Sequence, residues 1–124
     1  MCQSIAEVDS PLKKHQWKNR IVIINEDEAS FKAFQENKFG ISDRQLILIS
    51  IQNETLKSFP STPGLNPQSI MTYYQLIPGQ PEVILIGKDG GIKRRSQELK
   101  VEEIFTLIDG MPMRKYEMGR KRRT

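Results

Sequence analysis

Three nearly uninterrupted apolar runs divide the chain, at residues 21–24, 46–51 and 83–86. Short runs of this kind, rich in β-branched side chains, are typical of strands that are covered on both faces of a sheet. Residues 92–95 follow the third run but carry only one apolar side chain. Because Asp89-Gly90 before them is a strong signal for a type I′ turn, we predict a β-hairpin whose second strand is a charged edge strand.

The segment after the first apolar run has the features of a helix. Asn25 and Glu28 fit a capping box at its start, and Gly40 fits a left-handed C-terminal cap. The side chains expected to anchor this helix to the core are Phe31, Ala33, Phe34 and Phe39.

Two further helices are predicted from apolar residues that recur at i, i+3, i+4 and i+7. Asn66-Pro67 supplies an N-cap and a proline at the first helical position for one, and Gly110 ends the other. Residues 52–65, which contain Pro60, Pro63 and Gly64, are predicted to be a loop. The recurring positions are Ile70, Tyr73, Tyr74 and Ile77 in the first of these helices and Val101, Ile104, Phe105 and Ile108 in the second.

The resulting order is β-α-β-α-β-β-α, an α/β fold with a mixed four-stranded sheet, and the crossover helix makes the first two strands parallel. It is the minimal thioredoxin-like arrangement, with a C-terminal hairpin and helix. We expect an irregular lead over residues 1–16, one domain over 17–113 and a basic tail over 114–124. Pro81 precedes the third strand, where thioredoxin-like folds place a cis-proline, so the Gln80–Pro81 bond is a candidate for the cis form at a pocket edge.

The totals narrow the class of protein. With 124 residues the chain suits one domain, and no stretch approaches the roughly 20 apolar residues of a membrane span, which argues against an integral membrane protein. The N-terminal residues lack the apolar core of a secretion signal, so a cytoplasmic location is expected for the chain as given. Export is the alternative if a signal peptide preceded Met1.

The runs LIGKDGGIKRRSQEL and IFTLIDGMPMRKYEM, behind WKNRIVII and SDRQLILISI, resemble a family of thioredoxin-like domains of unknown function, the P-DUDES. Such domains occur in short bacterial proteins, in secreted sushi-repeat-containing proteins and in the secreted protein called down-regulated by oncogenes. The resemblance covers residues 17–118. It implies a relative of thioredoxin and peroxiredoxin that lacks their chemistry.

The residues themselves support the same expectation. Thioredoxins and peroxiredoxins need an activated cysteine where the first strand meets its helix, because the thiolate is the nucleophile. Here residues 25–31 read NEDEASF, and the single cysteine is Cys2. Thiol chemistry through Cys2 is kept as an alternative, as is an enzyme with non-thiol chemistry in a pocket near Pro81.

Other candidate groups have ordinary structural explanations. Glu26, Asp27 and Glu28 would suit a hard cation, but capping and solvation of a helix start account for them. His15, the single histidine, lies in the irregular lead and is expected at the surface. Trp17 is expected to pack over the end of the core, with stacking on a ligand as the alternative. We predict no catalytic residue, metal or cofactor.

The net charge of +4 is concentrated at the C-terminus, where residues 114–124 hold six basic side chains and one acid, Glu117. A second positive patch is predicted at the hairpin, although charged edge strands also serve to prevent aggregation. We therefore expect a redox-inactive interaction module with an unknown protein or polyanion as its partner, nucleic acid included but without sequence specificity. The expected contacts are Lys88, Lys93, Arg94, Arg95, Arg114, Arg120, Lys121, Arg122 and Arg123.

Overall fold

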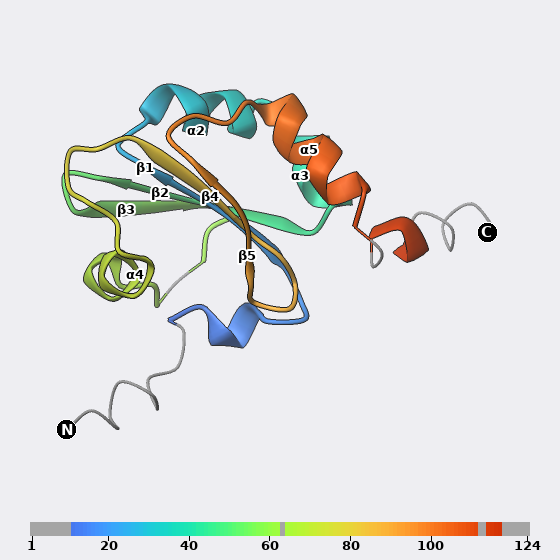
Figure 1. Ribbon diagram of the computed structural model, residues 1–124, viewed down its shortest axis with the longest axis horizontal. Coiled ribbons are helices and arrows are strands. Elements are labelled where there is room, and N and C mark those ends of the chain that lie inside the picture. Colours follow the sequence, from blue (N-terminus) through green and yellow to red (C-terminus); the bar gives the residue numbers. More distant parts are fainter. Residues whose placement is uncertain (1–10, 63, 112–113, 118–124) are drawn as a thin grey trace.

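A computed structural model describes residues 11–62, 64–111 and 114–117 of the chain (Figure 1). Five strands and short helices alternate along it. The strands are β1 (Arg20–Asn25), β2 (Leu46–Gln52), β3 (Thr55–Phe59), β4 (Glu82–Ile86) and β5 (Ile92–Ser96). The helices are the 3-10 turn η1 (Lys13–His15), α2 (Glu28–Gln35), α3 (Lys38–Asp43), α4 (Pro67–Tyr74) and α5 (Val101–Asp109). Residues 114–117 add a helical turn.

The strands form one mixed sheet in the order β3-β2-β1-β4-β5. β1 and β2 are parallel, with Ile21 opposite Ile47, which confirms the predicted crossover. β4 is antiparallel to β1, with Ile23 opposite Ile84. The charged hairpin strand β5 lies at one edge, as expected, and β3 lies at the other.

Alternate residues of the central strands enter two separate cores. Ile23, Ile49 and Ile84 pack on one face of the sheet against α4, and Leu12 before η1 joins them. Val22 and Leu85 pack on the other face with residues of α2, α3 and α5. Figure 1 shows the same layers, with α2, α3 and α5 on one side of the sheet and α4 and η1 on the other. This two-sided cover explains why the strands read as continuous apolar runs.

The sheet has five strands, so the prediction of four was wrong. The fifth, β3, lies inside the predicted loop 52–65 and pairs antiparallel with β2. Asn53 and Glu54 join the two strands with φ of 51° and 63°. Positive φ at both central residues is the hallmark of a type I′ hairpin turn.

The predicted helix from Asn25 to Gly40 is two helices. Asn25 is the buried last residue of β1, and the N-cap is Asp27, whose Oδ1 accepts a hydrogen bond from the Ser30 backbone N–H at 3.1 Å. Phe39 is 84% exposed and does not anchor a helix to the core. The chain turns at Asn37, so Phe39 belongs to a second helix, where its side chain faces solvent. Gly40 lies inside α3, not at a C-terminal cap.

Helices α4 and α5 begin and end close to the predicted residues. Asn66 caps α4 by accepting from the Ser69 backbone N–H at 2.9 Å, with Pro67 in the first turn. Gly110 is the C-cap of α5. Ile77, however, lies beyond the end of α4 and is 53% exposed, since α4 stops at Tyr74.

The β4–β5 turn differs from the type I′ prediction. Only Gly90 has a positive φ, 88°, and the Gly87 backbone N–H donates to the Gly91 carbonyl at 3.0 Å. The connection is therefore a five-residue loop, closed by a hydrogen bond from the Gly91 N–H to the Asp89 carboxylate at 2.9 Å.

The proline prediction was also wrong. Within the described residues the cis peptide bond is Phe59–Pro60, and Gln80–Pro81 is trans. Pro81 is exposed at the start of β4.

Candidate functional site

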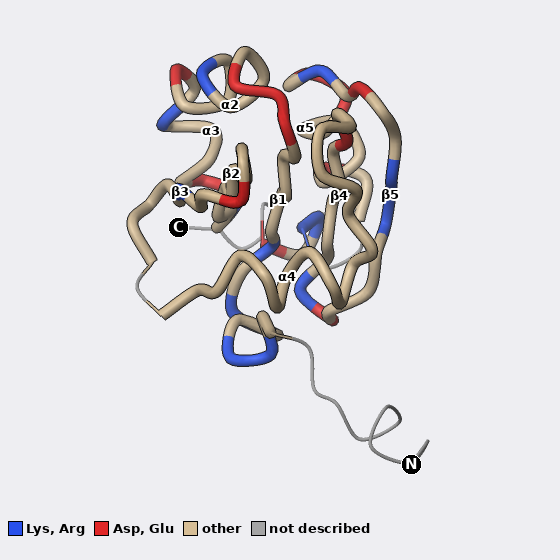
Figure 2. Tube along the Cα trace, turned by 90° about the vertical axis from the view of Figure 1, so that its left-hand side faces the viewer, with Lys and Arg blue, Asp and Glu red and all other residues tan. Residues whose placement is uncertain are grey.

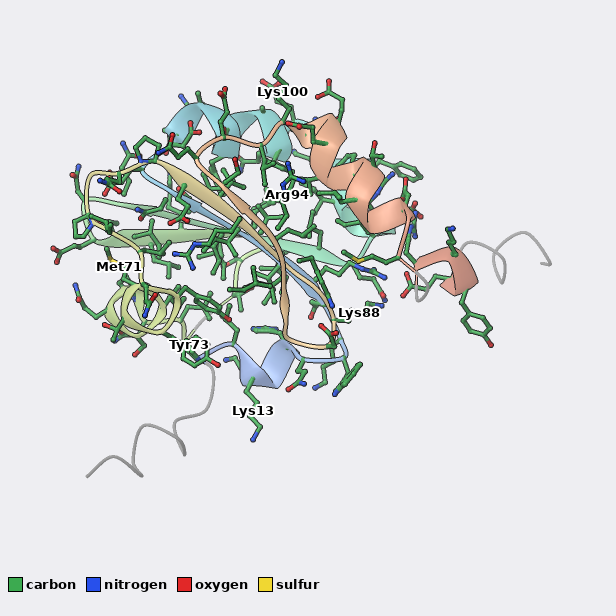
Figure 3. All side chains as sticks on the ribbon, viewed as in Figure 1. Lys13, Met71, Tyr73, Lys88, Arg94 and Lys100 are labelled. Carbon is green, nitrogen blue, oxygen red and sulfur yellow. The ribbon has the colours of Figure 1, made fainter. Side chains whose placement is uncertain are left out.

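The structure buries two of the predicted contact residues. Lys88 is 8% exposed and Arg114 only 2%, so neither belongs to a free positive surface. Both are held by acidic side chains at the end of the sheet where β1 begins. Figure 3 shows Lys88 at this end, and Arg94 further along the same hairpin. Lys88 and Arg114 are therefore paired with acids inside the domain, and their contact with a partner stays a prediction.

Lys88 shares one acid with the buried arginine that begins the neighbouring strand β1. Its Nζ donates to Glu117 Oε2 at 2.6 Å and also to the Gln45 side-chain oxygen. Arg20, 1% exposed, donates to the same carboxylate through Nη1 at 3.3 Å and Nη2 at 3.5 Å. Burial raises the pKa of Glu117, but the hydrogen bonds and positive charges of Lys88 and Arg20 outweigh this and hold it below 4.5.

Arg114 forms a second ionic cluster beside the first. Its Nη1 donates to the Asp43 carbonyl at 2.9 Å, its Nη2 to the Asp43 carboxylate at 2.5 Å and its Nε to Asp109 at 3.2 Å. Asp109 also accepts from Arg44 Nη2 at 2.8 Å, and the Arg44 guanidinium lies 4.1 Å from the centre of the Phe105 ring. Burial raises the pKa of Asp109. The hydrogen bonds and positive charges of Arg44 and Arg114 lower it by more, so the pKa of Asp109 lies below its ordinary value. Residues 114–117 thus contact the domain, past the predicted boundary at 113.

The positive charge of β5 is partly neutralised. Lys93 pairs with Asp89 at 2.8 Å. Arg95 pairs with Glu82 and donates to the Tyr74 carbonyl at 2.6 Å, at the end of α4. Arg94 is exposed on the opposite face of the sheet, where its side chain borders α5 (Figure 3). The hairpin therefore presents less free charge than its sequence suggests.

The clearest group of exposed cations lies around η1. Lys13, Lys14 and Lys18 are all exposed, and residues 11–25 contain no acid. Figure 2 shows this basic turn projecting at the end of the domain, beyond the beginning of β1. Lys115 adds an exposed cation on the helical turn of residues 114–117.

Trp17 stands among these lysines and is 60% exposed, so the prediction that it packs over the core was wrong. Its φ is 70°, a left-handed backbone conformation that bulky residues rarely adopt. The Trp17 backbone N–H donates to the Lys88 carbonyl at 2.5 Å, which holds the turn in this conformation. The indole is consequently held at the surface.

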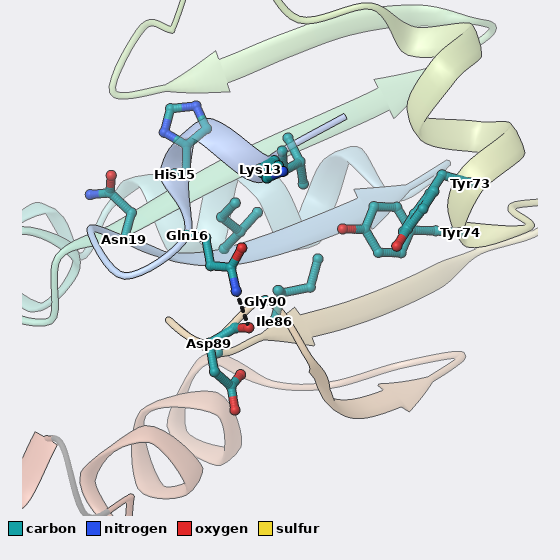
Figure 4. Close-up of a pocket in the computed structure, with 12 residues that line it drawn as sticks. Lys13, His15, Gln16, Asn19, Tyr73, Tyr74, Ile86, Asp89 and Gly90 are labelled. Atoms are coloured by element: carbon teal, nitrogen blue, oxygen red, sulfur yellow. Dashed lines mark hydrogen bonds between the residues drawn. The ribbon is translucent and has the colours of Figure 1, made fainter. Parts of the chain in front are cut away.

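A cavity of about 260 Å³ opens beside η1, between the β4–β5 loop and α4 (Figure 4). Ile21 and Ile86 are among the residues that line it, and Tyr73 and Tyr74 line it from α4. Gln16 spans the far side, where its side-chain N–H donates to the Asp89 carbonyl at 2.8 Å.

His15 lies at the rim of this cavity, and its Nε2 is buried without a hydrogen-bond partner. Burial lowers the pKa of His15 below 6.5. A hydrogen bond with Asn19 opposes this shift, and the nearby charges of Lys14 and Lys18 add to it.

The opposite end of β1, where a redox-active thioredoxin-like domain is expected to carry a cysteine, is closed by an amide. Asn25 is fully buried and its Nδ2 donates to the carbonyls of Ile77 at 3.1 Å and Gln80 at 2.9 Å. Glu28 pairs with Lys57 at 2.9 Å. Among residues 11–62, 64–111 and 114–117, no three His, Cys, Asp or Glu side chains are grouped as a metal site would require.

Several predicted positions lie outside the described residues. These are Cys2 and the tail cations Arg120, Lys121, Arg122 and Arg123. Within the described part of the chain, no helix combines the length and apolar character needed to cross a bilayer.

The sheet order and flanking helices define a thioredoxin-like α/β domain. The reduced 2-Cys peroxiredoxin of Plasmodium vivax has a similar structure, with a TM-score of 0.60 over 85% of this chain and 84% of that chain, at 12% sequence identity. The chain belongs to the family described as "Domain of unknown function (DUF4174)", whose model matches residues 11–117. A search of curated proteins found no match.

The sequence analysis missed the residues that hold the basic end together, namely Arg20, Asp43, Arg44, Asp109 and Glu117. Their partners are far apart in the chain, so no local spacing reveals them. One signal was available, because Glu117 is the single acid in an otherwise basic run and Arg20 directly precedes a fully apolar strand. Buried charges are nearly always paired, so a positive charge at the start of a buried strand predicts an acidic partner from elsewhere in the chain.

Proposed function

We propose that this domain is a polyanion-binding module whose contact surface is the η1 end of the fold together with the basic residues that follow Glu117. The observation that carries the proposal is the surface-held Trp17 among the exposed Lys13, Lys14 and Lys18. Lysines neutralise phosphate or sulfate groups and release their counterions, and an exposed indole adds a stacking face.

The backbone of Trp17 supports this proposal. A non-glycine residue in the left-handed region carries strain that the surrounding structure must compensate, and such strain concentrates at functional sites. Here the strained turn keeps the largest side chain of the chain away from a core that it would otherwise stabilise. A contact role for the indole accounts for that arrangement.

The position of the C-terminal segment adds the second line of support. Glu117 contacts Lys88, and the Lys88 carbonyl accepts the Trp17 N–H, so the last described residue lies at the same end of the sheet as Trp17. Arg120 follows only three residues later. The four tail cations predicted as contacts therefore continue the chain from this end of the sheet, outside the described residues. The predicted tail contacts and the η1 lysines then act on one ligand.

The absence of a thiol from residues 25–31 supports a binding role over thiol chemistry. The amide of Asn25 fills the end of β1 with hydrogen bonds to the chain before Pro81, which weighs against a substrate pocket there. The resemblance to the P-DUDES, described as relatives of peroxiredoxin without its chemistry, fits the same proposal.

The single tryptophan makes the test direct, because all indole fluorescence comes from the proposed surface. Titrating the full chain with heparin and with short single-stranded DNA is expected to change the Trp17 emission. Lys14→Gln with Lys18→Gln is expected to weaken binding by about tenfold, at ~0.5–1 kcal/mol for each lost surface charge. The matched control, Lys57→Gln with Lys100→Gln, removes two exposed lysines elsewhere. Equal binding by both double variants would refute the proposal.

A further inference from the structure

The carboxylate of Glu117 lies in a pocket of cations that it does not neutralise. Within residues 11–62, 64–111 and 114–117, Arg20 and Lys88 form ion pairs with Glu117 and with no other acid. Arg114 approaches the same carboxylate at 3.8 Å but is already paired with Asp43 and Asp109. Two largely buried positive charges thus share one negative charge.

The hydrogen-bond donors of this pocket are also incompletely used. The bonds from Arg20 to Glu117, at 3.3 and 3.5 Å, are long for charge-assisted bonds, which are usually about 2.7–2.9 Å. The Arg20 Nε is buried and has no hydrogen-bond partner, although the residue is only 1% exposed. A buried donor without an acceptor is costly, so the pocket suits a ligand with more oxygens than a carboxylate has.

We propose that Arg20 and Lys88 form a binding site for a phosphate group, which Glu117 occupies as an internal substitute until the phosphate displaces it. A phosphate monoester carries about −1.5 to −2 charge and three acceptor oxygens. Its charge therefore matches the two cations better than a single carboxylate does.

The structure allows this exchange without unfolding. The Glu117 side chain is 24% exposed, whereas Arg114 holds the helical turn independently through Asp43 and Asp109. Rotation of one side chain toward solvent opens the pocket. The incoming phosphate replaces the negative charge of Glu117, so Arg20 and Lys88 remain paired with an anion.

The experiment follows the backbone amide signals of Trp17, Arg20 and Lys88 by NMR during titration with inorganic phosphate at constant ionic strength. Wild-type protein is expected to bind, and Glu117→Ala to bind about tenfold more tightly, because the internal competitor is gone. Glu102→Ala, an exposed acid on α5, changes the net charge equally and is expected to match the wild type. Lys88→Met is expected to abolish binding.

Wild-type protein without phosphate-dependent shifts at these amides would overturn the proposal, as would equal affinities of the Glu117→Ala and Glu102→Ala variants. If Glu117→Ala fails to fold, Glu117→Gln keeps the shape and removes the charge, with the same expectation. A second arm uses a short oligonucleotide with and without a 5′-phosphate on a chain ending at Glu117. Tighter binding of the phosphorylated form identifies a phosphate end group as a ligand.

The second arm rests on the proposed polyanion function, but the first does not. Loss of heparin binding in the Lys14 and Lys18 variant tests the η1 surface alone. The two ideas therefore fail separately.

Discussion

Replacing Arg114 with methionine tests whether the C-terminal turn is part of the folded domain. The Arg114 side chain is 3% exposed and makes three hydrogen bonds, two to Asp43 and one to Asp109. Methionine keeps most of the aliphatic length but removes every donor. Asp43 then loses its ion pair with Arg114, and Asp109 keeps its ion pair with Arg44.

The expected cost follows from these contacts. Breaking a fully buried ion pair costs about 3–5 kcal/mol, because the remaining charge is left without compensation. Here the acids are 21% and 35% exposed, so water partly solvates and screens them and the figure must be reduced. We expect the free energy of unfolding to fall by about 2–3 kcal/mol, which corresponds to roughly 10 °C in Tm for a domain of this size.

Urea unfolding followed by circular dichroism measures this change, with an unchanged m-value showing that the transition stays two-state. Lys115→Met is the matched control, since it removes an exposed neighbouring cation, and its expected effect is within about 0.5 kcal/mol. An Arg114→Met chain as stable as the Lys115→Met chain would show that the turn is not docked in solution.

Three further predictions concern pH and packing. Because the folded-state pKa values of Glu117 and Asp109 are depressed, their stabilisation is complete above the ordinary values of 4.5 and 3.8 and is lost as pH falls through the folded values. Glu117→Gln should therefore flatten the acid side of a stability profile measured by urea unfolding. The pKa of His15 is lowered below 6.5, so the folded state favours the neutral form and stability declines as pH falls below 6.5. Because a nearby anion favours protonated His15, heparin affinity should rise as pH falls over the same range, in wild type more than in His15→Gln. Gly40→Ala places a methyl group 2.6 Å from the Phe105 ring and should cost about 1–3 kcal/mol in thermal unfolding. The control Gly110→Ala should be near-neutral, because Gly110 has a φ of −84° and the nearest atoms to its new methyl group lie 3.6 Å away. An unchanged Tm for Gly40→Ala would mean that α3 does not pack on α5 as described.

The local pattern of apolar and polar residues was sufficient to predict the central strands and the helices at 67–74 and 101–109. These elements bury one or two apolar faces, and burial is what periodicity reports. Strand β3 was not predicted because it is an edge strand whose residues are mostly half-exposed. Asn53 was a usable signal for the turn before it, since asparagine is common in tight turns. The helix after β1 was predicted to be too long, because Phe39 fits the spacing of a helix. The structure has a turn at Asn37, and Phe39 lies beyond it in a separate helix.

The candidate site was harder to predict for a physical reason. Whether Lys88 is a surface charge or a buried one depends on Glu117, 29 residues away in the chain. The exposure of Trp17 could not be predicted either. A backbone hydrogen bond to Lys88 holds Trp17 at the surface, and the order of side chains along the sequence does not reveal a backbone bond of this kind. Charge counts from the sequence therefore placed the polyanion surface on the hairpin and the tail, whereas the η1 surface is proposed from the exposure of Trp17 and the lysines around it.

The salt dependence of heparin binding, read from Trp17 fluorescence, tests the central proposal most directly when the full chain is compared with a chain ending at Glu117. The shorter chain keeps Arg114 and Glu117 and so preserves both ionic clusters, whereas an end at residue 113 would remove them. With four cations fewer, it should bind through the η1 lysines with a log–log salt slope shallower by about 3, since each neutralised charge contributes roughly 0.7–0.9. Equal slopes, or no change in Trp17 emission with either chain, would contradict the account.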